Sequence, residues 1–448
     1  MATAADLPVR KGTGSEVSKT LDGPVPRSLG TLDQGAFWVN LGVSLLGFTG
    51  AATVMMPAGA PALSFLAALT ATVAGTVIGS LMLGLSAVPG AQTQAPSMVL
   101  LRGLFGARLS AVPTVLNVLQ LIGWGTFELL AITQGAQAIF GGPAWPYVLI
   151  TGALTTAMTI WPLGAVRLLR RYVTIAVAIS LVYLFVQILR QPVPDLNAGS
   201  WQGFWLGTDA ALAVAVSFIP LASDYSRHAK SAKAAFSTAF FGYSIAQILC
   251  YALGLLVLLQ AGTLDEPYKP FLAVPLGAIF LGVLVLREAD QSFADTYSTG
   301  VSLQNLLPRT DRRVLTIGVG IVTTALALTM DISQYAGFLV LIGSVFVPLF
   351  GVLAADYFGR NRHRDPSAAW DLSQTAPSRW RMSLAWVLGL AVYQLIHPGD
   401  AGWWSRAWVE LASALHFTPA GWMSASLFSF IVAAVLAWLL GRIPSRQR

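Results

Sequence analysis

The chain has 448 residues, of which 55% are hydrophobic and only 10% are charged. Soluble proteins carry about 25% charged residues, so this composition excludes an ordinary soluble domain. The net charge is +7, but no aromatic-rich basic patch accompanies it, which argues against a nucleic-acid partner. The single cysteine, Cys250, excludes an intrachain disulfide.

Residues 1–33 are polar and contain glycine, proline and serine, so we expect a flexible cytoplasmic tail. Beyond the tail, long apolar stretches lack charged residues, as between Asp33 and Arg102. A helix needs about 20 apolar residues to cross the hydrocarbon core, and these stretches are too long for barrel strands. The sequence therefore predicts an all-α membrane protein with twelve transmembrane helices, at 34–57, 62–89, 112–140, 145–165, 171–190, 208–225, 236–261, 271–300, 313–331, 335–358, 381–398 and 421–441.

Basic residues are distributed unevenly along this path through the membrane. With the N-terminus inside, 23 of the 27 Lys and Arg residues lie in the tails and in the loops on the cytoplasmic side. Cytoplasmic loops are generally enriched in Lys and Arg. The pattern predicts a multi-pass protein of the cell membrane with both termini in the cytoplasm. It also predicts a basic cytoplasmic loop at 359–380 and a cytoplasmic tail at 443–448.

Two of the predicted spans contain residues that interrupt helices. The first has Gly47 and Gly50 on either side of Phe48 and Thr49, and the sixth has Pro220 in its middle. For either span alone, a plain kink is an equally good interpretation. Broken helices at matching positions of two repeats, however, are typical of a transporter binding site.

The two interrupted spans are the first helices of two five-span halves. Because five is an odd number, the halves thread the membrane in opposite directions, which makes them inverted repeats. This symmetry rests on the parity and on the interruptions, because no residue-level repeat is evident. We expect a transport core at 34–358, built from repeats at 34–190 and 208–358, with two peripheral helices within 381–442.

Ionisable residues within membrane spans are costly and therefore face a partner or a cavity. Glu128 lies in the third span, one turn after Trp124, so the two share a helix face. An indole plane beside a carboxyl group suits a flat heterocycle. The alternative is a carboxylate that is satisfied by a neighbouring helix.

The eighth span carries four ionisable residues within a short segment. Arg287 can form an internal ion pair with Glu288 or Asp290, which would be a structural role. Asp295 then remains as a proton carrier, a cation ligand or a substrate contact, unless this part of the helix is simply hydrated. No metal-ligand spacing, phosphate loop or nucleophile–base arrangement is present, which argues against an enzyme. An extracellular ligand domain or repeated pore loop, as in a receptor or channel, is also missing from the sequence.

Four segments carry a family resemblance. They read LNVLQLIGWGTFE, SFIPLASDYSRHAKSAKAAF, FADTYSTGVS and GVLAADYFGRNR, and the likeness covers about residues 30–360. They resemble the nucleobase:cation symporter-1 family, also called purine–cytosine permeases, and most of all its branch of hydroxymethylpyrimidine and cytosine transporters. The resemblance implies a leucine-transporter-like fold. Substrate would then lie between the first and sixth helices and helices three and eight.

The resemblance also implies roles for individual residues. Carried over by motif, Trp124 would stack on the base, and Glu128 stands where members often have Gln. Asp295 stands where many members have a substrate-contacting Asn, and Phe218 where an aromatic residue often covers the ligand. An ionised Glu128 only accepts hydrogen bonds, which favours a substrate edge rich in N–H groups, such as an aminopyrimidine.

The residues at the expected cation site depart from the family pattern. Sodium-driven members often carry adjacent Ser and Thr in the eighth span, where this chain has Ala289 and Asp290. The co-transported cation is therefore either a proton or a sodium ion. We expect Asp290, Ala289 and Gly47 near this cation, and Phe48 and Thr49 near the substrate.

The sequence thus predicts a cation symporter, without an organic cofactor, that imports a pyrimidine-type base such as cytosine or hydroxymethylpyrimidine by alternating access. Carriers of purines, of other nitrogen heterocycles or of amino acids with the same fold are the alternatives. A membrane-embedded enzyme or a receptor is less favoured. The expected partners are the nucleobase-like substrate, the cation and the lipid bilayer, and the expected state is a monomer or weak oligomer.

Overall fold

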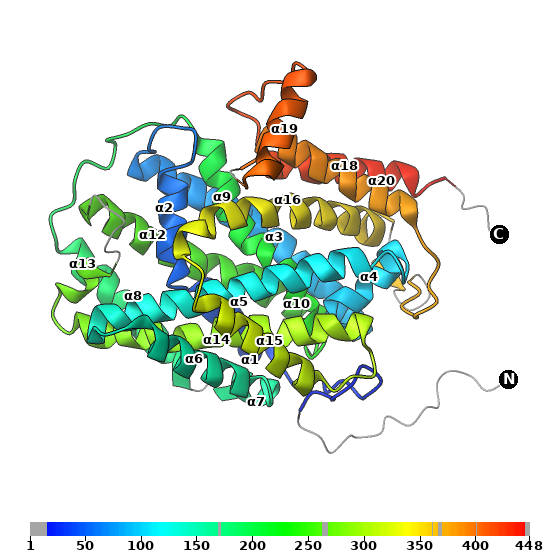
Figure 1. Cartoon of the computed structure of the whole chain (residues 1–448), viewed down its shortest axis with the longest axis horizontal. Coiled ribbons are helices and arrows are strands. Elements are labelled where there is room, and N and C mark those ends of the chain that lie inside the picture. The colour runs from blue at the N-terminus through cyan, green and yellow to red at the C-terminus, as the bar shows by residue number, and fades with distance from the viewer. Residues whose placement is uncertain are drawn as a thin grey trace.

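The computed structural model describes residues 16–168, 172–261, 268–360, 362–365, 370–399 and 401–443. Residues 1–15 and 444–448 of the predicted tails, and the predicted cytoplasmic Arg170 and Arg171, lie outside these ranges. Every named element within the described ranges is a helix. The long helices pack side by side into one bundle (Figure 1).

The described helices are grouped by the two predicted halves and the residues that follow them. The first half contains α1 (Thr31–Gly42), α2 (Leu46–Met55), α3 (Phe65–Thr93), α4 (Ser97–Phe105), α5 (Ala111–Phe140), α6 (Ala144–Met158), α7 (Pro162–Leu168) and α8 (Thr174–Leu189). The second contains α9 (Phe204–Ser217), α10 (Ile219–Ser226), α11 (Ala232–Ser237), η2 (Thr238–Gly242), α12 (Tyr243–Ala261), α13 (Lys269–Leu272), α14 (Gly277–Leu306), α15 (Arg312–Ala327), η3 (Ile332–Gln334), α16 (Tyr335–Leu353) and η4 (Ala354–Phe358). After these come η5 (Arg362–Arg364), α18 (Trp380–Ile396), α19 (Trp403–Ala414) and α20 (Ala425–Leu440).

Length and apolar composition qualify most of these elements to cross a membrane. Within the described residues, five helices qualify alone and two bent pairs, α1 with α2 and α6 with α7, qualify together. Three shorter apolar helices, α8, α18 and α20, lie at further predicted spans. The remaining two predicted spans correspond to α14, with its four ionisable side chains, and to α15. Each predicted span therefore overlaps a helix or a helix pair.

The first span is broken, but at a different place from the predicted one. The chain bends by 57° between α1 and α2, and Val43, Ser44 and Leu45 form the connection. Gly47 and Gly50, which were expected to break the helix, lie inside α2 instead. They allow α2 to approach α12 closely, because a Cβ on Gly47 would lie 2.7 Å from Cys250 Sγ.

The sixth span is interrupted at Phe218, next to Pro220, but it keeps its direction, so the expected second break is present without a bend. α9 and α10 meet at Phe218 and together pass as one 23-residue span, Phe204–Ser226. Pro220 lies in the first turn of α10, where a missing backbone N–H removes no hydrogen bond from the helix. Its position explains why a proline near the middle of this span does not bend it.

The described part of the N-terminal tail is not free, which corrects the expectation for residues 16–30. Leu29 N donates to the carbonyl of His228 at 3.0 Å, and Lys230 N donates back to the carbonyl of Leu29 at 3.2 Å. Further back, the carbonyl of Lys19 accepts from the backbone N–H of Arg312 at 2.8 Å. This segment therefore binds the loop after α10 and the start of α15, both in the second half of the bundle. The bonds are made by backbone groups, so the polar composition of the segment does not reveal them.

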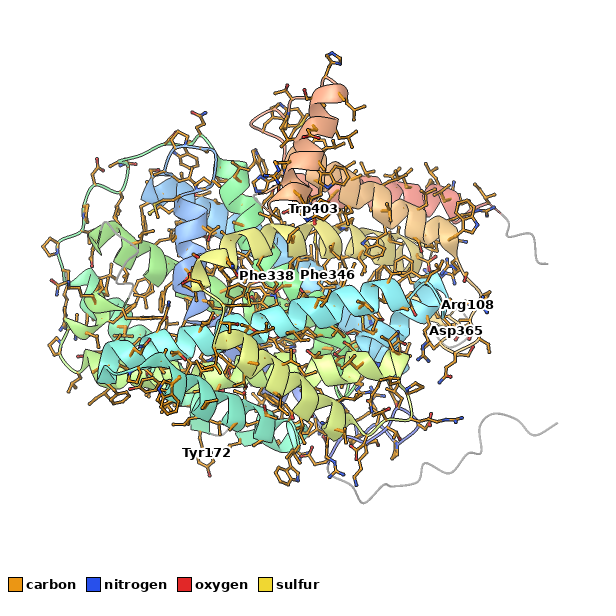
Figure 2. The ribbon with its side chains drawn as sticks, in the orientation of Figure 1. Arg108, Tyr172, Phe338, Phe346, Asp365 and Trp403 are labelled. Atoms are coloured by element: carbon orange, nitrogen blue, oxygen red, sulfur yellow. The ribbon has the colours of Figure 1, made fainter. Side chains whose placement is uncertain are left out.

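Charged side chains hold the loop after η4 against the same end of the bundle. Asp356 accepts from Arg379 at 2.7 Å and from the indole of Trp370 at 3.2 Å. Figure 2 shows Arg108 and Asp365 at this same end. At the other end of the peripheral helices, α19 stands out from the body of the bundle (Figure 1). α19 was not predicted from the sequence, because the apolar residues of this helix alternate too often with polar ones to form a span.

Candidate transport site

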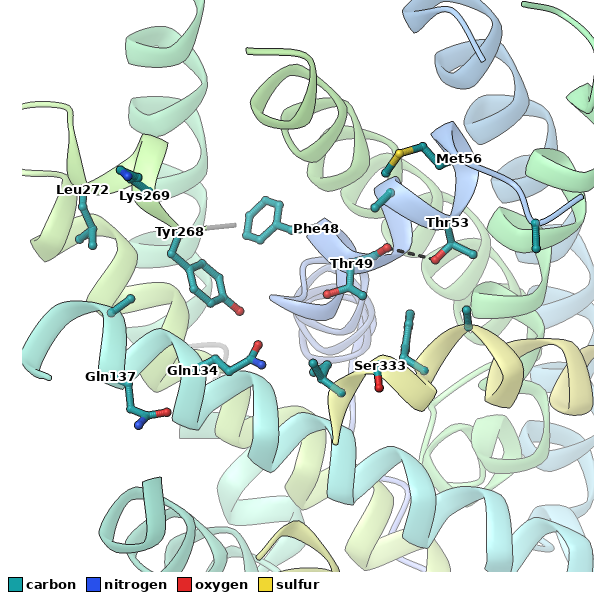
Figure 3. A pocket seen from close by; sticks show the side chains of 16 residues that line it. Phe48, Thr49, Thr53, Met56, Gln134, Gln137, Tyr268, Lys269, Leu272 and Ser333 are labelled. Atoms are coloured by element: carbon teal, nitrogen blue, oxygen red, sulfur yellow. Dashed lines mark hydrogen bonds between the residues drawn. The ribbon is translucent and has the colours of Figure 1, made fainter. Parts of the chain in front are cut away.

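A cavity of about 810 Å³ opens at the bundle end that the charge pattern predicts to be extracellular. Its walls come from α2, the last third of α5, α13 and the junction of η3 with α16. Phe48 and Thr49, both expected at the substrate, line it, and Figure 3 shows them facing Tyr268 and Gln134 across the space. Tyr268 and Gln134 were not predicted. Gln134 could have been identified from the sequence, because it is a polar residue within the apolar third span.

Aromatic rings close the bottom of this cavity. Trp124 and Phe218 lie nearly parallel, with ring centroids 6.5 Å apart and planes inclined by 23°. Tyr335 and Phe338 contact the edges of the indole, at centroid distances of 5.7 and 5.4 Å. Tyr335 lines both the large cavity and a small one below it, which also borders Trp124, Phe218 and the break in the first span.

The small cavity has a volume of about 20 Å³. That is enough for about one water molecule and not for a planar base. The indole Nε1 of Trp124 is buried and has no hydrogen-bond partner among the described residues. Buried indole N–H groups usually find a partner. The arrangement therefore provides an aromatic plane and a free donor at the small cavity, and Tyr335 lies between this point and the large cavity.

Side chains from α14 fill the break between α1 and α2. The guanidinium of Arg287 donates to the carbonyl of Asn40, and the amide of Gln291 donates to the carbonyls of Leu41 and Val43, at 2.8 and 3.2 Å. These carbonyls belong to the end of α1 and to the connection, where regular helical hydrogen bonds stop, although the carbonyl of Asn40 also accepts from the N–H of Val43 at 3.1 Å.

The other side of the break is held by a carboxylate. Glu288 accepts from the backbone N–H of Leu45 at 3.0 Å and from the hydroxyl of Ser44 at 2.5 Å. Arg287 in turn lies 2.8 Å from Glu288 Oε2 and 3.2 Å from Asp290 Oδ1. The expected internal ion pair is therefore present with both acidic partners, and all three side chains are buried.

The other predicted site residues separate into two groups. Trp124, Phe218 and Gly47 surround the small cavity, whereas neither Glu128 nor Asp295 lines either cavity. Glu128 is buried beside the ion pair, with its carboxyl group against that of Glu288. Glu128 has neighbours on α14, but its Oε2 has no hydrogen-bond partner among the described residues, so both interpretations of Glu128 stay predictions.

Three further predicted residues, Ala289, Asp290 and Asp295, lie on α14. Asp295 is buried more than one helical turn after the ion pair along α14, near Tyr225. Ala289 is buried and offers only a methyl group, and Asp290 already pairs with Arg287. Within the part of the chain that the structure describes, no group of three His, Cys, Asp or Glu side chains is arranged to hold a metal ion.

The bundle is closed at the end opposite the large cavity. The rings of Phe37 and Tyr225 lie 4.1 Å apart, and Gln34 donates to the carbonyl of Tyr225 at 3.2 Å. Arg227 donates to the hydroxyl of Tyr297 at 3.3 Å. Since α1 and α10 meet here, the first and sixth spans close this end, whereas the large cavity opens at the other end between α2, α5, α13 and α16. This is the geometry of a carrier open to one side.

Solved structures show the same fold. The chain matches a closed, bromovinylhydantoin-bound structure of Mhp1, a nucleobase-cation-symport-1 family transporter, with a TM-score of 0.73 and 17% identity, over 95% of this chain and 94% of that one. An inward-facing structure of Mhp1 matches with a TM-score of 0.69 and 16% identity, over 95% of both chains. A sodium-coupled sialic acid symporter matches at 0.59 and 14% identity, over 96% of this chain and 94% of that one.

These likenesses confirm the predicted all-helical, leucine-transporter-like fold. A search of curated protein sequences gives no match. A family of permeases, described as "Permease for cytosine/purines, uracil, thiamine, allantoin", matches residues 26–418. The predicted family is thereby confirmed at this level, and the expectation that the chain is a transporter and not an enzyme is confirmed with it. The chain belongs to the cytosine/purine permease family.

Proposed function

We propose that this permease is a secondary active transporter of the cell membrane that imports a pyrimidine-type base, such as cytosine or hydroxymethylpyrimidine, together with a cation. The observation that carries the proposal is the pair of nearly parallel rings of Trp124 and Phe218, which line the small cavity next to the large one, with Tyr335 bordering both. The unpartnered indole N–H beside them would recognise an acceptor on the ligand.

The spacing of the two rings favours a flat guest. A planar ring stacked between them requires about 7 Å, twice the carbon contact distance of about 3.5 Å. The observed centroid distance of 6.5 Å is close to this value. A small outward movement of Phe218, with displacement of Tyr335 from the floor, would admit a base. Closure of the same aromatic residues over the base would then separate it from the cavity, as alternating access requires.

The structure argues against an amino-acid carrier of the same fold. Such carriers bind the substrate carboxylate at the freed N–H groups of a broken helix. Here the N–H of Leu45, at the start of α2, is already bonded to Glu288. A substrate carboxylate would meet a buried carboxylate at this point. A neutral heterocycle avoids that repulsion.

Uptake of labelled cytosine into proteoliposomes tests the proposal, with an inward proton gradient, an inward sodium gradient, or both. Uracil, hydroxymethylpyrimidine, adenine and allantoin are added as competitors. We expect Trp124→Ala to abolish uptake and Trp438→Ala, in the peripheral helix α20, to retain it. Competition by adenine alone would favour the purine alternative. Normal uptake by Trp124→Ala would remove Trp124 from the site.

A further inference from the structure

The break in the first span has an electrical polarity. The end of α1 presents carbonyl oxygens and the start of α2 presents N–H groups, which correspond to partial negative and positive charges. In broken membrane helices, such carbonyls coordinate a co-transported cation, and such N–H groups face an anionic group. In this chain both positions are taken by neighbouring side chains of one helix, α14, with Arg287 at the carbonyl side and Glu288 at the N–H side.

The guanidinium of Arg287 is enclosed where it lies. It bonds the carbonyl of Asn40, and it contacts Glu288 at 2.8 Å and Asp290 at 3.2 Å, with only 2% of the residue exposed. An arginine side chain does not lose its proton in proteins, so its charge is permanent. A sodium ion at the same carbonyls would face a fixed positive charge at contact distance, in surroundings that water screens poorly.

The remaining oxygen atoms at the break are occupied too. Gln291 donates to the carbonyls of Leu41 and Val43, so these backbone oxygens already have a partner. Sodium binding there would need several oxygen ligands at once. Ala289 adds none, because its side chain is a methyl group.

We propose that Arg287 is a resident cation that takes the position of a coupling sodium ion, so that substrate binding and transport do not depend on sodium. This inference rests on the proposed cation symport, and it leaves the proton as the cation that drives it. Arg287 acts as a positioning residue: together with Glu288 it holds the two parts of the first span at a fixed angle in place of an ion.

Sodium-specific stabilisation of the purified protein tests this inference without a substrate. The thermal unfolding midpoint is measured in detergent at equal concentrations of NaCl, KCl and choline chloride. A ligand at concentration c that binds only the folded state stabilises it by RT ln(1 + c/Kd), so the midpoint keeps rising with ligand concentration. We expect the same midpoint in all three salts. A rise that is specific to sodium and grows with its concentration in the unaltered protein would overturn the proposal.

The variant Arg287→Ala provides the converse test. It removes the guanidinium from the carbonyl of Asn40 and leaves Glu288 and Asp290 without their cationic partner, so we expect it to gain a sodium-specific rise in the midpoint that grows with sodium concentration. Arg102→Ala is the matched control, because Arg102 is also buried and bonds backbone carbonyls, those of Leu372 and Asn305, away from the break. We expect Arg102→Ala to lose stability equally in all salts.

A folded Arg287→Ala that stays insensitive to sodium would contradict the proposal. If that variant does not fold, the comparison of salts on the unaltered protein decides, and Arg287→Lys, which keeps the charge, must stay insensitive to sodium. The proposed transport function is tested separately by uptake. Sodium-dependent cytosine uptake would contradict this inference and support the proposed function. A protein that is insensitive to sodium and transports no base would contradict the proposed function and leave this inference in place.

Discussion

At the residue scale, Trp124 offers two separable interactions, a ring face toward Phe218 and an indole N–H without a partner in the described structure. Trp124→Phe keeps a ring and removes the N–H. A neutral hydrogen bond contributes about 0.5–1.5 kcal/mol net, so we expect the KM for the transported base to rise by about 2- to 12-fold. Trp386→Phe is the control, since its indole bonds the carbonyl of Val345 outside the site. An unchanged KM in Trp124→Phe would show that the N–H does not bind the substrate.

Glu128 poses a different question at this scale, because it lies beside Glu288 and borders neither cavity. The two carboxyl groups lie side by side, so a change at one of them alters the surroundings of the other. Glu128→Gln keeps the shape and removes one acidic group. We expect the pH dependence of uptake to change while the protein stays folded. An unchanged substrate profile and pH curve in this variant would assign Glu128 a purely structural role.

At the element scale, the segment of residues 16–30 connects parts of the bundle that must separate when a carrier opens to the cytoplasm. Arg27 donates to the carbonyls of Ala229 and Lys230, both at 3.1 Å. The carboxylate of Glu16 accepts from the N–H groups of Leu163 and Gly164 at the start of α7, at 3.0 and 2.6 Å. The segment is thus bound to both α7 and the loop after α10.

Removal of one of these bonds should loosen this end of the bundle. Arg27→Ala removes charged hydrogen bonds, which contribute about 1.5–3 kcal/mol when buried and less here, where Arg27 is partly exposed. We expect a lower thermal midpoint and faster hydrogen exchange at residues 228–230. Arg313→Ala, which breaks an exposed ion pair with Asp311, serves as the control and should change neither. Equal exchange rates in Arg27→Ala and the unaltered protein would contradict this role.

His228 makes the same contact sensitive to acid. Its Nδ1 lies 2.9 Å from the carbonyl of Pro26, and its Nε2 accepts from Arg227 at 3.3 Å, so the ring is neutral. Burial, with a smaller effect of the Arg227 charge, lowers the pKa of His228 to about 3. Between an unfolded pKa of about 6.5 and this value, only the unfolded chain binds the proton, so stability falls as pH falls.

The predicted loss from His228 is about 2 kcal/mol at pH 5, since each pKa unit corresponds to about 1.36 kcal/mol. The thermal midpoint of the unaltered protein should therefore drop between pH 7 and pH 5 by more than that of His228→Asn. The asparagine keeps an N–H near the carbonyl of Pro26 and does not titrate. Parallel pH curves for the two proteins would show that His228 is not neutral in the folded state.

The sequence predicted positions of helices better than their interruptions. Apolar length placed each span, because membrane insertion depends on composition over about 20 residues. The break in the first span was placed at Gly47 and Gly50, but these glycines serve close packing against α12, and the chain bends at Val43 to Leu45. Arg287 and Gln291 define that bend from another helix. Such a contact between distant residues is not visible in a local pattern.

The candidate site residues that were predicted are those that lie in recognisable sequence motifs. Trp124 and Phe218 were identified from their motifs, and the structure places them face to face. The contribution of Tyr335 and Tyr268 to the cavity was missed, since aromatic residues at span ends are common in membrane proteins and carry no distinguishing signal. The packing of residues 16–30 was missed because backbone hydrogen bonds leave no trace in side-chain composition.

At the scale of the whole molecule, the charge pattern predicts an orientation in the membrane that places the large cavity outside. Ser413 on α19 and Ser373 in the loop before α18 are both exposed and lie at opposite ends of the bundle. In intact cells, a membrane-impermeant maleimide should label Ser413→Cys and label Ser373→Cys only after lysis. Cys250 is buried, so the unaltered protein is the unlabelled control. The reverse labelling pattern would invert the topology.

The most direct measurement of the central claim is accumulation of labelled pyrimidine bases in proteoliposomes that contain either the unaltered protein or Trp124→Ala. Cytosine and hydroxymethylpyrimidine are offered in turn with an inward proton gradient and no sodium. We expect at least one of them to accumulate against its gradient with the unaltered protein and neither with Trp124→Ala. Accumulation of neither base by the unaltered protein, or equal accumulation by both proteins, would contradict the account.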